Sequence, residues 1–167
     1  MKILRAYGIP DIIVDLIERM YVGTMARVIT EDGLTEAFRI LAGVLQGDTL
    51  APYLFIIVVD YIMLTVFGEY ENSGFTITPA RSRRVKAEKL TDADFADDIT
   101  LLADSMNEAQ AMLDSLETAA LQVGLKMNDD KTKFMSVNIP EEEPQVMKAS
   151  SGEDIEQVED LFTLEPG

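Results

Sequence analysis

Residues 90–103 read LTDADFADDITLLA, and the four residues Phe95-Ala96-Asp97-Asp98 at the centre of this stretch decide the fold that we expect. Adjacent aspartates between two β-prone runs are costly unless their carboxylates are solvated at a turn or neutralised by a cation. In a regular strand, neighbouring side chains point to opposite faces. We therefore predict a β-hairpin whose tight connection holds Asp97 and Asp98, so that both carboxylates can point to one side.

Two carboxylates gathered on a rigid hairpin form an oxygen-rich site that suits Mg²⁺, which proteins often hold through one or two carboxylates and substrate phosphates. Such a site favours phosphoryl or nucleotidyl transfer assisted by a metal. An acidic pair in a solvated surface turn is the alternative interpretation of the same residues. A calcium-binding EF-hand loop that begins at Asp92 is excluded, because Ala96 and Ala103 stand where that loop requires acidic ligands.

A second stretch, GVLQGDTLAP at residues 43–52, precedes an apolar helix predicted for residues 53–67. Glycine lets the backbone adopt positive φ and approach a ligand closely, and the Gln46 side chain both donates and accepts hydrogen bonds. Such a loop could lie against a base pair or a sugar. An ordinary loop that leads into a helix explains the same residues without a ligand.

A third stretch, GLKMNDDKTK at residues 124–133, follows a helix predicted to run from the capping box Ser105-Met106-Asn107-Glu108 to Val123. Gly124 is expected to end that helix. Lys131 could offer a positive charge or a proton to a departing phosphate. The alternative is that Lys131 is an ordinary solvated surface group, as most lysines are.

These three stretches, in this order and spacing, resemble the palm motifs of reverse transcriptases, in particular those of non-LTR (LINE-type) retrotransposons. The aromatic-Ala-Asp-Asp motif corresponds to residues 95–98, the Gly-x-x-Gln-Gly loop to residues 43–47, and the Gly-Leu-x-x-Asn-x-x-Lys-Thr segment to residues 124–132. The similarity extends over residues 1–138. Residues 154–167 only faintly resemble the segment that leads to the thumb in that family.

The resemblance implies an RNA-directed DNA polymerase that adds dNTPs to a DNA primer on an RNA template. It implies that Asp97 and Asp98 are catalytic and help bind two Mg²⁺ (or Mn²⁺) ions, with Asp97 the stronger candidate for a direct ligand. These ions would activate the primer 3′-hydroxyl and hold the triphosphate. Lys131 would act on the leaving pyrophosphate.

The resemblance also implies residues that contact the substrates. Gln46 and Gly47 would shape the surface that faces the nucleotide and the template. Phe95 belongs to the same substrate-binding region, where it would anchor the turn by packing beneath it.

Members of that family carry a further metal-binding Asp on a strand ahead of the region that residues 1–10 resemble. Asp11, Asp15 and Asp60 do not match that position, because each falls in a helical pattern. We therefore expect the 167 residues to have little or no polymerase activity by themselves, since this Asp, the fingers and most of the thumb are absent from them. The alternatives are a non-catalytic acidic interaction module and a degenerate remnant of a mobile element.

The composition indicates a globular protein, with 167 residues of which 47% are hydrophobic. The chain has no cysteine and no histidine, which excludes disulfides, zinc–thiolate sites, cysteine nucleophiles and histidine bases. The N-terminus lacks an apolar signal core, and the apolar run at residues 53–59 is too short to span a bilayer. We therefore expect no membrane contact and an intracellular location, either cytoplasmic or nuclear.

The net charge of −16 is unfavourable for a protein that binds nucleic acid, because phosphates attract lysine and arginine. Residues 141–167 carry nine acidic residues and one lysine, so half of the excess negative charge lies in this segment. A single basic cluster consists of Arg81, Arg83, Arg84, Lys86 and Lys89. This cluster could follow a nucleic-acid backbone or simply solvate a hairpin, and nucleic-acid binding is expected to be weak and salt-sensitive.

Hydrophobic periodicity and turn residues predict an α+β fold in which helices cover one face of an antiparallel sheet. Helices are expected at residues 11–22, 53–67 and 105–123. Strands are expected at residues 25–30, 34–40, 75–78, 85–90, 99–103 and 133–137. By resemblance, this fold is an incomplete ferredoxin-like polymerase palm.

The domain organisation follows from the composition near the C-terminus. Residues 1–139 are predicted to form a partial palm domain, and residues 140–167 a loosely ordered acidic linker and tail that begins with Pro-Glu-Glu-Glu-Pro. Hydrophobic surface that other polymerase domains would cover is expected to be exposed and to promote self-association.

Overall fold

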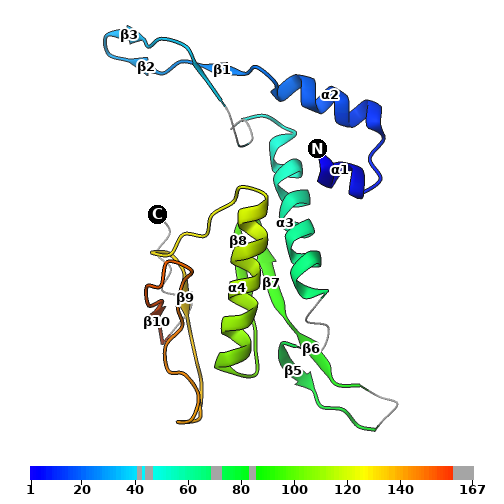
Figure 1. Cartoon of the computed structure of the whole chain (residues 1–167), viewed down its shortest axis with the longest axis vertical. Helices are drawn as coiled ribbons and strands as arrows, with labels where there is room; N and C mark the ends of the chain where they lie inside the picture. The colour runs from blue at the N-terminus through cyan, green and yellow to red at the C-terminus, as the bar shows by residue number, and fades with distance from the viewer. Residues whose placement is uncertain (41–42, 44–46, 69–72, 83–85, 160–167) are drawn as a thin grey trace. The chain divides into compact units, whose positions relative to one another are not determined.

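The computed structural model describes residues 1–40, 43, 47–68, 73–82 and 86–159, and its helices and strands are drawn in Figure 1. The helices are α1 (Lys2–Ala6), α2 (Asp11–Tyr21), α3 (Ala51–Phe67) and α4 (Met106–Gln122). The strands are β1 (Met25–Ala26), β2 (Ile29–Thr30), β3 (Gly33–Leu34), β4 (Phe38–Arg39), β5 (Phe75–Thr78), β6 (Glu88–Leu90), β7 (Asp92–Phe95), β8 (Asp98–Leu101), β9 (Lys133–Phe134) and β10 (Glu156–Gln157). The chain divides into two compact units, Met1–Tyr61 and Ile62–Gly167.

The strands of the described residues form five separate two-stranded sheets: β1–β4, β2–β3, β5–β6, β7–β8 and β9–β10. Four pairs are antiparallel, and β9–β10 is parallel. The mixture of helices and strands confirms the predicted α+β class. The described strands do not form the expected continuous antiparallel sheet, because each of them pairs with a single neighbour.

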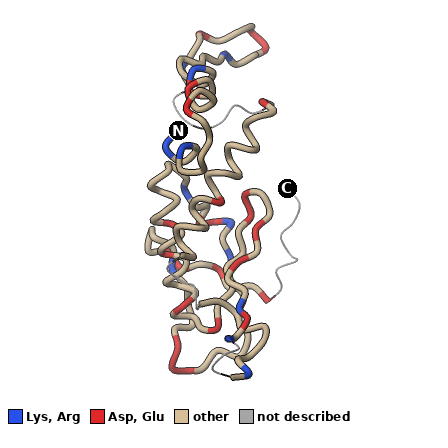
Figure 2. Tube along the Cα trace, turned by 90° about the vertical axis from the view of Figure 1, so that its right-hand side faces the viewer, with Lys and Arg blue, Asp and Glu red and all other residues tan. Residues whose placement is uncertain are grey.

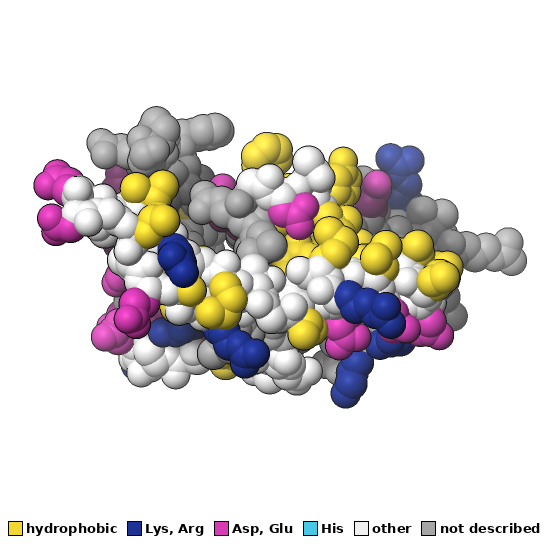
Figure 3. All heavy atoms as spheres, turned by 90° about the horizontal axis from the view of Figure 1, so that it is seen from above, with side chains coloured by type: hydrophobic (Ala, Val, Ile, Leu, Met, Phe, Trp, Pro, Cys, Tyr) yellow, Lys and Arg dark blue, Asp and Glu magenta, His cyan; other side chains and the backbone are white. Residues whose placement is uncertain are grey.

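The first unit is built around the amphipathic helix α2. Its Val14 and Ile17 pack with Leu4 of α1 in a small buried cluster. Arg5 ties the two helices together, because its guanidinium lies 2.7 Å from Asp11 Oδ1 and 3.0 Å from Asp15 Oδ1. The apolar face of α2 is only partly used, since Ile12 is 78% exposed. Exposed hydrophobic side chains of this kind are visible in Figure 3, in agreement with the expectation of uncovered apolar surface.

Beyond α2, the chain forms a narrow antiparallel ribbon. Ile29 pairs with Leu34 and Thr30 with Gly33, so that Glu31 and Asp32 make the turn. Glu31 and Asp32, followed by Gly33, stand between the strands predicted at residues 25–30 and 34–40 and so indicate a hairpin. The pairing confirms it.

Helix α3 is apolar on nearly every side, a pattern that predicts a buried central helix. Ala51, Val59, Ile62, Met63 and Val66 are buried, but Tyr53, Ile56 and Leu64 are exposed. This prediction was therefore wrong for one side of the helix, because hydrophobic sequence alone does not indicate which side is covered.

An aspartate inside an apolar helix is expected either to find a partner or to reach a helix edge, and the carboxylate of Asp60 in α3 has a partner. The hydroxyl of Tyr7 donates a hydrogen bond to Asp60 Oδ2. Burial, together with this bond, raises the pKa of Tyr7 to about 12. The bond satisfies the one charged group of the helix and attaches α1 to α3.

Helix α4 begins and ends as its sequence predicts. Ser105 Oγ accepts a hydrogen bond from the amide of Glu108 at 3.2 Å. The Glu108 carboxylate in turn accepts one from the amide of Asp104 at 3.0 Å and one from Gly74 at 3.2 Å. At the other end, Gly124 has a φ of +82°, a conformation that glycine adopts without steric cost.

Residues 146–157 pack against α4, whereas the sequence predicted a loosely ordered tail. Met147, Ala149 and Ile155 belong to a buried cluster that also contains Met106, Leu113 and Phe134. The side-chain amide of Gln110 both donates to the Lys148 carbonyl and accepts from the Lys148 amide, each at 2.8 Å.

A second polar contact attaches the same segment to α4. The buried carboxylate of Glu117 accepts a hydrogen bond from the Ser150 amide at 3.0 Å. Acidic composition did not predict this order, because the stabilising partners lie more than 30 residues away along the chain. Residues 160–167 lie outside the described part of the chain.

Replacement of Gln110 by alanine tests this packing. The Gln110→Ala variant should lose about 1–2 kcal/mol of unfolding free energy, because each of the two hydrogen bonds contributes roughly 1 kcal/mol. It should also lose protection of the Lys148 amide in hydrogen exchange. Gln122→Ala, an exposed glutamine in the last turn of the same helix, is the matched control and should leave that amide protected. Equal protection in both variants would contradict the observed packing.

Candidate functional site

The adjacent aspartates lie on the predicted tight hairpin. In the β7–β8 pair, Phe95 is opposite Asp98 and Asp94 is opposite Ile99, so that two residues, Ala96 and Asp97, make the turn. The hairpin itself is confirmed. The expectation that both aspartates lie in the connection was half right, because Asp97 lies in the turn and Asp98 is the first residue of β8.

Ala96 carries the conformational strain of this turn. Its φ is +58°, and among the described residues the only other non-glycine residue with a positive φ is Asn138. A positive φ at the first turn residue alone is the pattern of a type II′ turn, in which glycine is usual. For an L-amino acid with a Cβ atom, this conformation costs roughly 1–2 kcal/mol. The turn is therefore held by the pairing of the strands rather than by local preference.

The hairpin register distributes the carboxylates between its two faces. Directly paired residues share a face, so Asp92 and Asp94 lie on the face of Ile99 and Leu101, and Leu101 packs against the core cluster at α4. On this face, burial raises the pKa of the Asp94 carboxyl, and the charge of Asp92 adds to the effect.

The opposite face of the hairpin carries Phe95 and Asp98. The Phe95 side chain is 82% exposed, so the prediction that it anchors the turn by packing beneath it was wrong. Phe95 is exposed because the register of the hairpin directs its side chain away from the face that holds Leu101 and packs on the core. Phe95 and Asp98 therefore form an exposed pair beside the turn.

Asp97 and Asp98 are both exposed, and within the described part of the chain neither has an ion-pair partner. By contrast, Asp104 binds Lys89 at 3.2 Å and accepts hydrogen bonds from Thr76, and these contacts lower its pKa. The two hairpin carboxylates are thus not used by the fold and remain available to a cation. Across the described ranges, no group of three or more acidic side chains is close enough to hold a metal.

The third predicted stretch forms a turn after α4. The side chain and the carbonyl of Asn128 both accept from the Lys131 amide, at 3.3 and 3.2 Å, and the carbonyl also accepts from Thr132. Asn128 and Thr132 therefore have clear structural roles. Lys131 is exposed in this turn, so packing within the described fold gives no reason for a lysine at this position.

The second predicted stretch lies in the other unit and is only partly described. Gln46 lies outside the described residues. Gly43 and Gly47 have φ values of +87° and +89°, and a Cβ at either position would meet no atom within 4 Å. This agrees with the expected use of glycine for positive φ, and it leaves open space beside both residues.

No sequence pattern indicated the hydrogen bond between Tyr21 and Asp48, which holds the C-terminal end of this stretch. Asp48 Oδ1 accepts from the Leu50 amide at 3.0 Å, and Asp48 Oδ2 accepts from the Tyr21 hydroxyl at 2.7 Å. The Leu50 amide, followed by Tyr21, lowers the pKa of Asp48. An Asp that accepts from the amide two residues on forms an Asx turn, which is common in loops, but nothing in the sequence indicated the tyrosine.

Two members of the basic cluster, Arg83 and Arg84, lie outside the described residues. Lys89 is engaged by Asp104, which leaves Arg81 and Lys86 as its exposed described members. Figure 2 shows acidic residues spread along the described trace, with basic residues sparse among them. Weak nucleic-acid binding stays a prediction from this charge distribution.

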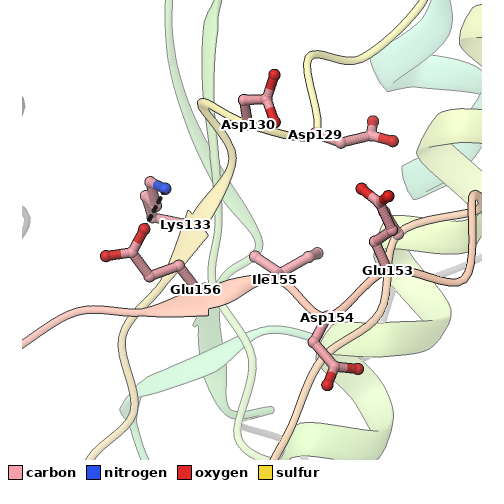
Figure 4. Close-up of a pocket in the computed structure, with 8 residues that line it drawn as sticks. Asp129, Asp130, Lys133, Glu153, Asp154, Ile155 and Glu156 are labelled. Atoms are coloured by element: carbon pink, nitrogen blue, oxygen red, sulfur yellow. Dashed lines mark hydrogen bonds and ion pairs between the residues drawn. The ribbon is translucent and has the colours of Figure 1, made fainter.

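A hollow of about 210 Å³ lies in the second unit and is strongly acidic. It is lined by Asp129, Asp130, Lys133, Ala149, Glu153, Asp154, Ile155 and Glu156. Lys133 forms an ion pair with Glu156, and Asp154 points away from the other carboxylates (Figure 4). The acidic groups do not converge on one point, so this hollow does not resemble a metal centre.

Comparison with known proteins agrees with the three motifs. A family model described as "Reverse transcriptase (RNA-dependent DNA polymerase)" matches residues 1–156. The chain is 33% identical over 150 residues to the Pol polyprotein of the type-2 retrotransposable element R2DM of Drosophila melanogaster, covering 89% of this chain and 13% of that protein. It is 29% identical over 136 residues to the R2 Pol polyprotein of Popillia japonica, covering 81% of this chain and 21% of that protein.

A third similar protein is the R2 Pol polyprotein of Nasonia vitripennis, which is 35% identical over 95 residues, or 57% of this chain and 8% of that protein. The chain thus spans about a fifth or less of the curated relatives it matches. No helix in the described ranges is long and apolar enough to cross a membrane.

The strained turn provides a test of the hairpin geometry. Ala96→Gly should raise the free energy of unfolding by about 1 kcal/mol, because glycine adopts a positive φ without the Cβ clash. The matched control is Ala93→Gly in the adjacent strand β7. It should lower the free energy of unfolding by roughly 0.5–1 kcal/mol, because glycine loses more conformational entropy on folding than alanine does. Urea unfolding measures both. If Ala96→Gly destabilised the protein as much as Ala93→Gly does, the positive φ assigned to Ala96 would be contradicted.

Proposed function

The chain belongs to the reverse transcriptase (RNA-dependent DNA polymerase) family, and from this we propose that it supplies the metal-binding hairpin of an RNA-directed DNA polymerase from a non-LTR retrotransposon. The observation that carries the proposal is the strained two-residue turn, whose two carboxylates have no ion-pair partner among the described residues, inside the matched residues 1–156. Strained backbone that the surrounding structure enforces is found preferentially at functional sites.

In this proposal, Asp97 and Asp98 hold the divalent cations. Their exposed oxygen ligands fit Mg²⁺ or Mn²⁺, which prefer carboxylates. Once bound, such ions would lower the pKa of the primer 3′-hydroxyl and neutralise charge on the triphosphate. Asp97, in the turn, is the stronger candidate for a direct ligand, and Asp98 acts from the start of β8. Phe95 shares the exposed face of Asp98, so we assign it to substrate contact rather than to packing.

The remaining roles are proposed for the other two motifs. Lys131, which the turn at Asn128 leaves exposed, supplies positive charge or a proton to the leaving pyrophosphate. Gly47 lets the nucleotide or the template approach the backbone closely, and Gln46 contributes hydrogen bonds there. The substrates are dNTPs, a DNA primer and an RNA template. The antiparallel hairpins with α4 correspond, in this proposal, to a ferredoxin-like palm.

Charge argues for a second candidate function. With a net charge of −16, these residues bind nucleic acid weakly by themselves, because phosphate binding requires cationic side chains. The alternative is a non-catalytic acidic interaction module, a remnant of a mobile element that no longer copies RNA. The two functions differ in whether the hairpin carboxylates bind a divalent cation.

Substitution of Asp97 tests the polymerase proposal. In the full-length polypeptide that carries these residues, Asp97→Asn should lower dNTP incorporation on an RNA template at least about 100-fold, the order of effect for a lost charge-stabilising group. Asp94→Asn is the matched control on the other face of the hairpin and should retain incorporation. Little incorporation is expected from the 167 residues alone. Robust incorporation by them that Asp97→Asn abolishes would refute that expectation.

Metal binding is tested separately by NMR titration with Mg²⁺. The amide signals of Asp97 and Asp98 should shift at millimolar Mg²⁺, because carboxylates on a fixed turn are preorganised for the ion. The chain contains its own control, since Asp129-Asp130 is the other Asp-Asp step and should respond less. Equal responses of the two pairs, or none, would favour the interaction module.

A further inference from the structure

Tyr21, the last residue of α2, is hydrogen-bonded to Asp48, the residue that follows Gly47. Tyr21 ends α2, and its hydroxyl donates to Asp48 Oδ2 at 2.7 Å across a separation of 27 residues. The Tyr21 ring packs against the buried cluster of Leu4, Val14 and Ile17. The ring is thus held by the core of the first unit, and the hydroxyl is aimed at the loop.

Asp48 is held from two directions. Its Oδ1 accepts from the Leu50 amide at 3.0 Å, and its carbonyl accepts from the Ala51 amide at 3.2 Å, so it is attached to the first turn of α3. Capping a helix needs only one carboxylate oxygen. The second oxygen is engaged by Tyr21, and hydrogen bonds to an ionised carboxylate are stronger than neutral ones. The side chain is therefore fixed between the end of α2 and the start of α3.

This attachment acts on the neighbouring residue Gly47. Its φ is +89°, and no described atom lies within 4 Å of the point that a Cβ would occupy, so no side chain fixes its backbone. Of its two neighbours in the chain, Asp48 is the one that the structure describes, and the attachment of Asp48 constrains the backbone of Gly47 from that side. Removal of the Tyr21 hydroxyl would free one side of Asp48 while leaving the cap on Leu50.

From the contacts of Asp48 with Tyr21 and Leu50, we propose that Tyr21 and Asp48 are positioning residues that hold the backbone of Gly47 for an incoming nucleotide. The inference rests on the proposed polymerase function, and it assigns to these two residues a role that none of the three sequence motifs indicated. Neither residue acts on the reacting atoms. Their effect is preorganisation, because a loop already held in its bound conformation loses less conformational entropy when the nucleotide binds.

The test is steady-state kinetics of dNTP incorporation by the full-length polypeptide. Tyr21→Phe keeps the ring in the core and removes only the hydroxyl, so KM for dNTP should rise about tenfold while kcat changes less than twofold. Asp48→Ala should reproduce this change in KM. Asp48→Asn keeps one oxygen that accepts from the Leu50 amide, and its NH2 group can donate to the Tyr21 hydroxyl oxygen, so it should restore most of the affinity for dNTP.

Two controls separate positioning from stability. Ile17→Val lowers the stability of the same cluster to a similar degree but leaves the bond between Tyr21 and Asp48 intact, so its KM should be normal. Tyr53→Phe removes a hydroxyl from an exposed tyrosine in the first turn of α3 and should have no effect.

The outcomes distinguish the two proposals. An unchanged KM in Tyr21→Phe, or an equal rise in Ile17→Val, would overturn the positioning role and leave the polymerase intact. Absence of template-dependent incorporation by the unsubstituted polypeptide would overturn the proposed function, and the positioning role with it. A rise in KM confined to Tyr21→Phe and Asp48→Ala, with recovery in Asp48→Asn, supports the inference.

Discussion

The register of the β7–β8 hairpin is the constraint on which the candidate site depends. Since Phe95 pairs with Asp98 and two residues make the turn, Asp97 is placed at the tip and Asp98 on the face opposite the core. A shift of β8 by one residue would exchange its faces, turning Asp98 toward the core cluster and Leu101 toward solvent. The strain at Ala96 is the cost of this register, and the apolar contacts of Leu101 with the α4 cluster help to offset it.

Local signals in the sequence predicted local structure well. The acidic step at Asp97-Asp98 indicated a tight hairpin, and the box at Ser105 and Glu108 located the start of α4. These predictions succeeded because each depends on residues within about four positions of one another. The signal that was missed, the bond between Tyr21 and Asp48, joins residues of different elements and leaves no periodic pattern in the sequence.

The predictions that failed concerned burial and order, which depend on contacts between residues far apart in the sequence. The family resemblance implied that Phe95 packs beneath the turn, but burial depends on the register and on what covers a face. Residues 146–157 were expected to be loose because their composition is acidic, yet three apolar side chains among them enter a cluster with residues of α4. Net charge describes how a surface interacts with phosphates and solvent, and it does not determine whether a segment folds. The roles of Lys131, Gln46 and Gly47 stay predictions.

The contacts between α4 and residues 148–150 also affect how the protein behaves toward other chains. In the small hairpin that contains the Lys148–Asp154 bridge, the Lys148 amide and carbonyl and the Ser150 amide point outward, away from the partner strand. Such an unpaired strand edge ordinarily invites a strand from another molecule to add to it. Here the side chains of Gln110 and Glu117 occupy those groups, so a helix closes the edge and makes it a poor template for intermolecular β-pairing.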